Sequence, residues 1–450
     1  MRHHFLIAIS IVAALASCSR AVTPKAWNDS DLEIANAILC DKTLETVDSM
    51  GHKLLLRGYN AGDGYNQTWI RDFNTFIETI LEVVDPDDVK QALTTFFLMQ
   101  QGNGEILDGY VPEAEFNWDD DSTYTSANAP GYVGFKNTVE TDQETSLIQA
   151  VRKYVLKTGD TAFLSEEVAG KTVLQRLEDA VGYLMREKLD PGYHLLTGAL
   201  TSDWGDVEDD PVNCVDIGPE STTTIDIYDN AMMVIALRDM AALDPGSKEK
   251  WDSMREGFSS AAKKYLWDGK NQKFIPHLYP DGCKHGMDFD ENLIHYHGGT
   301  AIAIEADLLS KDEIRKVNED MLRNVRESGM PSIGLTVYPP YPDGFFPGGM
   351  KDGFNYQNGG DWTWFGGRMI QQLIRNGFIA EAYDEIRPMI DRVIVNGDFY
   401  EWYAPGCVPS GSSSFKGSAG VLCKAISMMK GWALAVSVQE VLNTTKDQTN

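Results

Sequence analysis

Apolar residues recur at helical spacing through most of this chain. Between residues 73 and 84 they occupy positions i, i+3, i+4, i+7 and i+8, namely Phe73, Phe76, Ile77, Ile80 and Leu81. This spacing places them on one face of an α-helix. Similar patterns predict further helices at 89–99, 144–156, 173–185, 225–243, 248–266, 297–309, 311–328, 364–376, 379–395 and 418–441. Alternating runs typical of strands are few and short, the best being 193–196 and 273–276.

These elements predict an all-α fold of roughly eleven or twelve helices in one domain, spanning residues 31–445. Loops of roughly ten to thirty residues, rich in glycine, aspartate and aromatic residues, separate the helices, and long ordered loops usually carry function. A barrel of paired helices with its loops gathered at one end fits this pattern. The alternative is a helical-repeat scaffold, but the chain shows no fixed repeat period.

The N-terminus has the features of an export signal. Residues 5–16 are almost entirely apolar, follow a short positive start and are too few to span a membrane. The segment LASC at 15–18 resembles the bacterial lipoprotein signal, in which lipid is attached to the thiol of Cys18. The sequence therefore predicts a signal peptide at 1–17, a tether at 18–30 and a lipid-anchored protein of the bacterial cell envelope, periplasmic or at the outer membrane. The alternative is an ordinary secretory signal with a coincidental cysteine.

Composition narrows the class of protein. With 450 residues, 43% of them hydrophobic and 24% charged, the chain is typical of a globular protein. Its net charge of -28 argues against nucleic-acid or anionic-lipid partners, which need clustered basic residues, and fits a neutral ligand. The six cysteines include no Cys-x-x-Cys pair, so the indication of a zinc site is weak. No later segment has about twenty successive apolar residues, so we expect membrane contact only through the lipid.

Four loop stretches combine aromatic residues with carboxylates, amides or arginine. They are YNQTWIRDF at 65–73, LTSDWGDVEDD at 200–210, FNYQNGGDWTW at 354–364 and DFYEWYAPGCVPSGSSSFKGSAG at 398–420, where Glu401 stands among aromatic residues. A sugar ring has apolar faces that stack on Trp and Tyr, and a rim of hydroxyls that needs planar polar partners. Glycoside cleavage also needs two carboxyl groups, one protonated and one ionised. Together the four stretches indicate a sugar-binding site with hydrolytic chemistry.

Each stretch also has a simpler explanation. The Arg-Asp pair at 71–72 could be a structural ion pair or a helix cap, and the acidic run at 203–210 could be a solvated loop or a calcium site. The tryptophans at 362 and 364 could belong to the core, and Glu401 could be a surface glutamate. The joint occurrence of all four stretches favours the sugar site.

The order of these motifs resembles the six-hairpin, (α/α)6-barrel glycosidases. Trp-x-Arg-Asp at 69–72 is followed by Asp-Trp-x-Asp at 203–206, by Tyr-x-Asn-Gly-x-x-Trp at 356–362 and by Glu-x-Tyr at 401–403 before a Gly-rich loop. The glucosidase half of glycogen-debranching enzymes, the mannosyl-oligosaccharide glucosidases and the trehalases are the families it is most similar to, and glucoamylases share the barrel more distantly. The resemblance extends over about 65–425. It implies an (α/α)6 toroid with a few short strands that works without a cofactor or metal.

The resemblance also implies an inverting mechanism, in which a general acid protonates the leaving group and a general base activates water. Glu401 matches the base and Asp206 the acid, with Asp203 as the rival for the acid role. The two carboxyl groups are expected roughly 6.5–9.5 Å apart, with a water between them. The other matched residues are implied in substrate binding: Trp69, Arg71, Asp72, Trp204, Tyr356, Asn358, Trp362, Trp364 and Trp402. The sequence departs from the family pattern in Gly360-Asp361 before Trp362 and in Trp364 beyond it, a difference that concerns the substrate subsite.

Three other groups of residues are weaker candidates. Asp142 and Glu144 open a predicted helix, where capping is the favoured role. His295 and His297 could line the pocket or bind a metal, but no third ligand is apparent. The serines at 410–418 lack a Gly-x-Ser-x-Gly elbow, which argues against a serine hydrolase.

We therefore expect an exported, exo-acting glycoside hydrolase for α-linked glucosides or related hexosides, monomeric and with an oligosaccharide as its partner. Two alternatives stay open. A disaccharide phosphorylase could use the same barrel, although export argues against it because the sugar phosphate is needed in the cytoplasm. A non-catalytic glycan-binding lipoprotein would keep the aromatic residues without needing Asp206 and Glu401, both of which are present.

Overall fold

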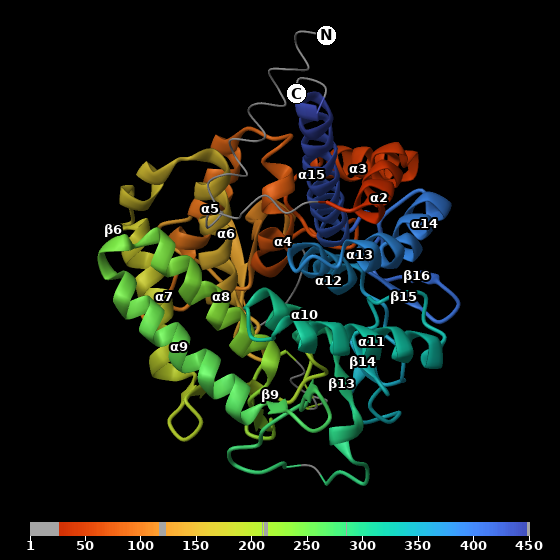
Figure 1. Ribbon diagram of the computed structural model, residues 1–450. Coiled ribbons are helices and arrows are strands. Elements are labelled where there is room, and N and C mark those ends of the chain that lie inside the picture. Colours follow the sequence, from red (N-terminus) through yellow and green to blue (C-terminus); the bar gives the residue numbers. More distant parts are fainter. Residues whose placement is uncertain (1–26, 117–122, 209, 211–214, 285, 448–450) are drawn as a thin grey trace.

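The computed structural model describes residues 27–116, 123–208, 210, 215–284 and 286–447, so Cys18 and the predicted signal peptide lie outside the described residues. In this part of the chain, six helices form an inner ring: α4 (Ile70–Ile80), α6 (Gln143–Thr158), α8 (Ile227–Leu243), α10 (His297–Glu305), α12 (Thr363–Arg375) and α15 (Lys416–Asp447). Each of these helices packs against the next, and α15 packs back against α4 (Figure 1). The ring is therefore closed.

A second layer of helices surrounds this ring, and each of its members precedes an inner helix in the chain. The outer helices are α3 (Lys42–Leu55), α5 (Pro86–Met99), α7 (Val173–Glu187), α9 (Lys248–Tyr265), α11 (Lys311–Ser328) and the pair α13 (Ile379–Glu385) and α14 (Arg387–Asn396). An additional helix, α2 (Asp29–Cys40), packs on α15. This is the (α/α)6 toroid that the sequence predicts.

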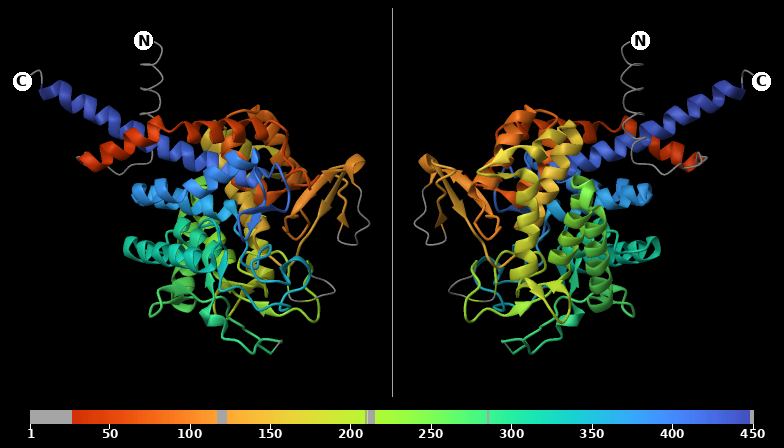
Figure 2. Two further views of the ribbon diagram at one scale, coloured as in Figure 1. Left: turned by 90° about the vertical axis from the view of Figure 1, so that its right-hand side faces the viewer. Right: turned by 90° about the vertical axis from the view of Figure 1, so that its left-hand side faces the viewer.

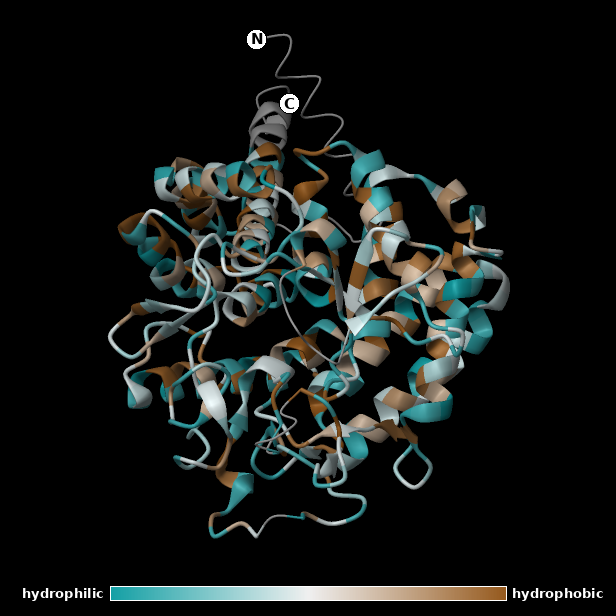
Figure 3. Cartoon of the chain, turned by 180° about the vertical axis from the view of Figure 1, so that it is seen from behind, coloured by the Kyte–Doolittle hydropathy of each residue, from teal (hydrophilic) through white to brown (hydrophobic). Residues whose placement is uncertain are grey.

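Burial separates the two layers. Every residue of α8 from 227 to 237 is buried, because the helix is covered on all sides. In the outer helix α11 the buried residues recur at helical spacing on one face: Ile314, Val317, Asn318, Asp320, Met321 and Asn324. Outer helices accordingly alternate between hydrophilic and hydrophobic segments (Figure 3).

One helix prediction was wrong in detail, and two helices were not predicted. The single helix predicted at 379–395 is two helices, separated at Ile386. Pro388 lies in the first turn of α14, where its missing N–H and fixed φ suit a helix start. The helices α2 and α3 were not predicted; they meet at Asp41, which caps α3 through its side chain.

Two of the short strands were expected. Residues 193–196 contain β8 (Leu195–Leu196), which pairs with β7 (Leu189–Asp190), and residues 273–276 contain β12 (Lys273–Phe274), which pairs with β11 (Trp267–Asp268). These hairpins lie outside the functional site described below.

A small antiparallel sheet beside the barrel was not predicted. Its order is β1-β2-β4-β3, from β1 (Thr68–Trp69), β2 (Gly109–Pro112), β4 (Tyr132–Phe135) and β3 (Thr123–Tyr124). β2 and β4 project from the helical body (Figure 2). Strands of two to four residues are too short to show a period-2 pattern, which is why the sequence did not reveal them. The sheet matters for two reasons. Its first strand, β1, leads directly into α4, and Phe135, the last residue of β4, lines the cavity described below.

The helix α15 is long and apolar enough over Lys416–Glu440 to cross a membrane by composition alone. However, it forms part of the barrel wall and buries Ala419, Leu422 and Ile426 completely. Its apolar character is therefore explained by the protein core. Beyond the barrel its C-terminal end extends away from the body of the molecule (Figure 2).

Candidate active site

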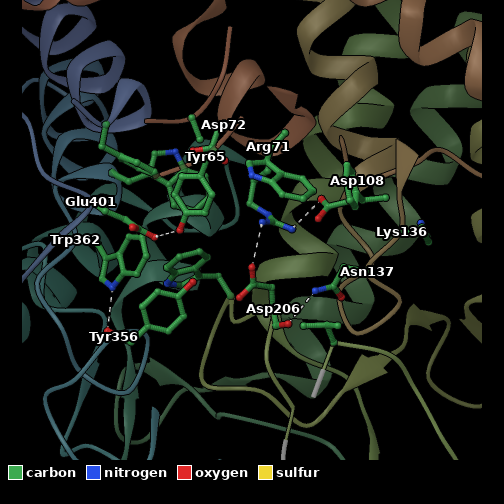
Figure 4. Close-up of a pocket in the computed structure, with 17 residues that line it drawn as sticks. Tyr65, Arg71, Asp72, Asp108, Lys136, Asn137, Asp206, Tyr356, Trp362 and Glu401 are labelled. Atoms are coloured by element: carbon green, nitrogen blue, oxygen red, sulfur yellow. Dashed lines mark hydrogen bonds and ion pairs between the residues drawn. The ribbon is translucent and has the colours of Figure 1, made fainter. Parts of the chain in front are cut away.

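A cavity of about 270 Å³ lies where the inner helices α4 and α12 begin. Residues from all four motif stretches line it, although they are spread over more than three hundred positions of sequence (Figure 4). The lining residues are Ala61, Tyr65, Trp69, Arg71, Asp72, Asp108, Phe135, Lys136, Asn137, Trp204, Asp206, Val215, Tyr356, Trp362, Trp364, Glu401 and Phe415. Aromatic rings and ionisable groups dominate this set, which is the composition expected of a sugar site.

Glu401 is buried and is held by two donors. The Tyr65 hydroxyl donates to Oε1 at 2.9 Å, and the backbone N–H of Ser412 donates to Oε2 at 2.7 Å. Burial raises the pKa of Glu401 to about 7, although these two hydrogen bonds lower it, and the nearby charge of Asp206 contributes to the rise. The carboxyl group can therefore change protonation state near neutral pH. The alternative of a surface glutamate is wrong.

The loop after Glu401 is shaped around this carboxylate. Gly411 adopts φ of +68°, a conformation that favours glycine. A Cβ atom at this position would lie 2.4 Å from Oε2 of Glu401. The glycine thus lets the backbone pass close enough for Ser412 to donate its hydrogen bond.

Asp206 lies across the cavity from Glu401 (Figure 4). Its Oδ1 accepts a hydrogen bond of 2.7 Å from the Gln357 side chain, and Oδ2 lies 4.0 Å from Nη1 of Arg71. The Asn137 side chain donates to the backbone carbonyl of Asp206 at 2.8 Å. With 28% of its side chain exposed, Asp206 is fixed in position and still accessible from the cavity.

Arg71 is buried in a cluster of carboxylates. Its Nε donates to Oδ2 of Asp142 at 2.7 Å, and its Nη2 contacts Glu140 and also lies 3.4 Å from Asp108. The Tyr228 hydroxyl also donates to Asp142. Arg71 therefore forms a structural ion pair, as the sequence allowed, but with Asp142 and Glu140 instead of Asp72. Arg71 also lines the cavity.

The capping role favoured for Asp142 is wrong. The residue occupies the position before α6, but its side chain makes no capping hydrogen bond because it binds Arg71. Glu144, two residues later, accepts a hydrogen bond from the backbone N–H of Ile106 and faces Lys136 at 3.8 Å. Both carboxylates support the loops around the cavity.

Two other carboxyl groups line the cavity with raised pKa values. Burial raises the pKa of Asp72 to about 7 and that of Asp108 to about 6, and in both cases the charge of Arg71 opposes the rise. Asp72 lies in the first turn of α4, where the helix dipole favours a negative charge. Burial therefore raises the pKa of three of the carboxyl groups that line the cavity, those of Asp72, Asp108 and Glu401.

One wall of the cavity is aromatic. Trp204 meets Trp362 and Trp364 edge-on, with ring centroids 4.6 and 4.9 Å apart. The indole of Trp362 donates to the backbone carbonyl of Tyr356 at 3.0 Å. Trp362 and Trp364 are therefore buried core residues that also line the cavity. The core role and the place at the site, considered as alternatives from the sequence, are both correct for these two residues.

Asp203 does not line this cavity. It is 1% exposed, and both of its carboxylate oxygens accept hydrogen bonds from the N–H of Gly299, at 2.9 and 3.0 Å, in the first turn of α10. Burial raises its pKa well above the usual value. The alternative of a solvated loop is wrong for this stretch, since Asp203, Trp204 and Glu208 are all buried.

Three other groups of predicted residues also lie outside the cavity lining. Asn358 accepts from the N–H of Tyr341 at 2.8 Å and donates to two backbone carbonyls, so it braces a loop. The rings of His295 and His297 stack on each other, away from the cavity, and His297 contacts the Asn324 amide at 3.0 Å. Trp402 packs against Tyr356 with ring centroids 6.3 Å apart.

The Gly360-Asp361 departure has a structural explanation. Asp361 is completely buried and accepts hydrogen bonds from Arg392 at 2.9 Å and from the N–H and hydroxyl of Ser332. This buried ion pair anchors the third stretch to α14. It supports Trp362 without entering the cavity.

The sequence did not predict eight residues that line the cavity, nor Gln357, which holds Asp206. The eight are Ala61, Tyr65, Asp108, Phe135, Lys136, Asn137, Val215 and Phe415. Tyr65, Gln357 and Phe415 belong to three of the quoted stretches, and their place in those stretches was the signal available. The others come from the small sheet and from loops without a distinctive motif. Only the folded chain brings them to the cavity.

Neither a protein-family model nor a curated protein sequence matches this chain. Solved structures do. The GH63 mannosylglycerate hydrolase from Thermus thermophilus, in complex with Tris and D-glycerate, has a TM-score of 0.61 at 14% identity over 84% of this chain and 99% of that chain. The same enzyme in complex with glucose also has a TM-score of 0.61, at 12% identity over 85% of this chain and 99% of that chain.

A GH78 rhamnosidase of Bacillus sp. GL1 has a TM-score of 0.54 at 15% identity, over 85% of this chain and 34% of that chain. This protein has the fold of the (α/α)6-barrel glycosidases. The resemblance in the motifs and the arrangement of the helices agree on that fold. At these sequence identities the comparison shows the fold only. The chemistry has to be argued from the residues of the cavity.

Proposed function

We propose that this protein is an inverting glycoside hydrolase that removes a terminal α-linked glucose or a related hexose from an oligosaccharide. The observation that carries the proposal is the placement of Glu401 and Asp206 on opposite sides of one aromatic-lined cavity, each held by its own donors. Two carboxyl groups that flank a bond are the chemical requirement of glycoside hydrolysis.

In this proposal Glu401 is the general base. Tyr65 and Ser412 each occupy one lone pair of the carboxylate, so each oxygen keeps another lone pair for a water molecule. Glu401 takes a proton from that water as the oxygen attacks the anomeric carbon. A pKa of about 7 suits a base that must be ionised near neutral pH.

Asp206 is the general acid. Gln357 holds Oδ1, and Oδ2 is free to carry the proton that passes to the glycosidic oxygen as the bond to the anomeric carbon breaks. The leaving sugar departs as a neutral alcohol, and the anomeric configuration is inverted. Asp203 cannot take this role without leaving the start of α10, since both of its oxygens are bonded there.

The size of the cavity supports an exo-acting enzyme. About 270 Å³ is near the lower end of small-ligand sites, roughly 300–1,000 Å³, and suits a terminal sugar better than the middle of a long chain. The glucose complex of the neighbouring hydrolase supports a hexose in the same barrel.

A phosphorylase is a weaker candidate on this geometry. It would need a phosphate site beside the sugar, and phosphate binding needs available positive charge. Among the described residues only Arg71 and Lys136 bring positive charge to the cavity, and both are already paired with carboxylates.

Export and lipid attachment at Cys18 remain part of our proposal, on the N-terminal sequence alone.

The decisive experiment is release of reducing sugar from a panel of α- and β-linked oligosaccharides by the chain that begins at residue 19. Glu401→Gln and Asp206→Asn are each expected to lose several orders of magnitude in kcat, and the anomer of the first product should be inverted. Glu45→Gln, on the exposed surface of α3, is the matched control. If no glycoside is cleaved with or without phosphate, or if both active-site variants keep activity, the proposal is wrong.

A further inference from the structure

We infer that the substrate is a glycoside with an uncharged leaving group, and that the site excludes leaving groups that carry a carboxylate, sulfate or phosphate. This inference rests on the proposed function and names its substrate class. It is carried by the way in which the charges around the cavity are paired.

The charge of Arg71 is more than balanced by residues of the protein. Asp142 and Glu140 pair with the guanidinium without lining the cavity, and Asp108 lies 3.4 Å from it. The nitrogen that approaches Asp206 can still donate to a sugar hydroxyl. An anion bound at that nitrogen would instead meet a guanidinium whose positive charge Asp142 and Glu140 already neutralise.

Lys136 is not available either. Its ammonium group donates to the carbonyl of Ile106 at 2.9 Å and to the Gln143 side chain at 3.1 Å, and it lies within 4 Å of Glu105 and Glu144. Only 2% of its side chain is exposed. Lys136 therefore forms part of the wall while its charge is committed to these partners.

The remaining ionisable groups at the cavity are mainly acidic. Asp72, Asp108, Asp206 and Glu401 all line it, and together they outnumber the two basic residues. A cavity with low-dielectric walls and charge of one sign repels ligands of that sign.

The test compares pairs of substrates that differ only in charge. Glucosylglycerol and glucosylglycerate, and the two mannosyl counterparts, present the same sugar with a neutral or an anionic leaving group. We expect kcat/KM at pH 7 to be at least about tenfold higher for the neutral member of each cleaved pair. Equal rates, or a preference for the glycerate member, would overturn the inference.

A substitution at the cavity wall gives an independent test. Val215 lines the cavity and is 37% exposed, so a longer side chain can be placed there. The measured quantity is the ratio of kcat/KM for the neutral substrate to kcat/KM for its glycerate counterpart. This ratio is expected to be at least about threefold smaller in Val215→Arg than in Val215→Gln, which adds a polar side chain without charge. If the two variants discriminate equally, charge does not decide the selectivity and the inference is wrong.

Binding separates this inference from the proposed function. Calorimetric titration of Glu401→Gln with the same pairs does not need catalysis. Binding of the neutral member alone, without turnover by the wild type, would overturn the hydrolase proposal and leave the charge selectivity standing. Turnover of both members with equal affinity would support the hydrolase proposal and overturn the charge selectivity. If no pair showed either turnover or binding, both the hydrolase proposal and the charge selectivity would be wrong.

Discussion

The hydroxyl of Tyr65 donates a hydrogen bond of 2.9 Å to Oε1 of Glu401, across 336 positions of sequence. This contact joins the segment that leads into the first inner helix to the segment that leads into the last. The same contact lowers the pKa of Glu401, the proposed base, so the position of Tyr65 affects the protonation state of this carboxyl group.

Tyr65→Phe tests that connection. A hydrogen bond to a charged group contributes about 1.5–3 kcal/mol, so its loss should raise the pKa of Glu401 by about one to two units. Since the base must be ionised, kcat/KM should fall about tenfold or more at pH 7 and recover as the pH rises. The measurement is the acidic limb of the pH–rate profile.

Tyr59→Phe is the matched control for this prediction. Tyr59 lies in the same segment, but its hydroxyl has no hydrogen-bond partner among the described residues and it does not line the active-site cavity. Its acidic limb should match that of the wild type. A Tyr65→Phe profile that also matches would show that the hydroxyl does not control Glu401.

Glu401→Gln should stabilise the protein at high pH. A carboxyl group whose pKa is raised from 4.5 to about 7 by burial destabilises the folded state once it is ionised. Its unfavourable contribution is absent below about pH 4.5 and grows as the pH rises towards 7. The amide carries no such penalty, so its advantage over the wild type should be about 1–3 kcal/mol larger at about pH 8 than at about pH 4.5.

Urea unfolding at the two pH values measures this difference. Glu45→Gln serves as the control, because Glu45 is exposed and pairs with Lys42 on the surface of α3. A pH-independent difference between Glu401→Gln and the wild type would mean that Glu401 is not a buried acid with a raised pKa.

Gly411→Ala should damage both stability and activity. The new methyl group meets φ of +68° and would lie 2.4 Å from the Glu401 carboxylate, so the loop or the carboxylate must move. We expect a loss of about 1–3 kcal/mol of stability and at least about tenfold in kcat. Gly406→Ala is matched to it, since Gly406 has φ of +75° and nothing within 4 Å of the new atom. Equal kcat values in the two variants would exclude the steric contact as the cause.

Asp203→Asn separates structure from chemistry. The amide offers one acceptor in place of two to the start of α10, but it also removes the burial penalty that raises the pKa of Asp203, so the free energy of unfolding should change by no more than about 1 kcal/mol. The folded fraction should keep kcat within about tenfold of the wild type, in contrast to Asp206→Asn. Thermal unfolding with activity per folded molecule measures both effects. A loss of several orders of magnitude in kcat would instead identify Asp203 as the acid.

The helical architecture could be predicted from local sequence patterns. Apolar spacing such as that of Phe73, Phe76 and Ile77 is a local property, since a helix orients each residue relative to its neighbours three and four positions away. The order of the motifs also indicated which loops would meet, and Trp69, Arg71, Asp206 and Glu401 do line one cavity.

The role of each of those residues depends on the folded structure. Asp203 and Asp206 lie on either side of the same tryptophan in sequence, yet one binds the N–H of Gly299 in α10 and the other faces the cavity. Likewise, Asp142 pairs with Arg71 from a distance of 71 positions. Such partners are set by the packing of distant helices, and burial against those partners, rather than residue type, fixes the pKa and therefore the chemistry of a carboxyl group.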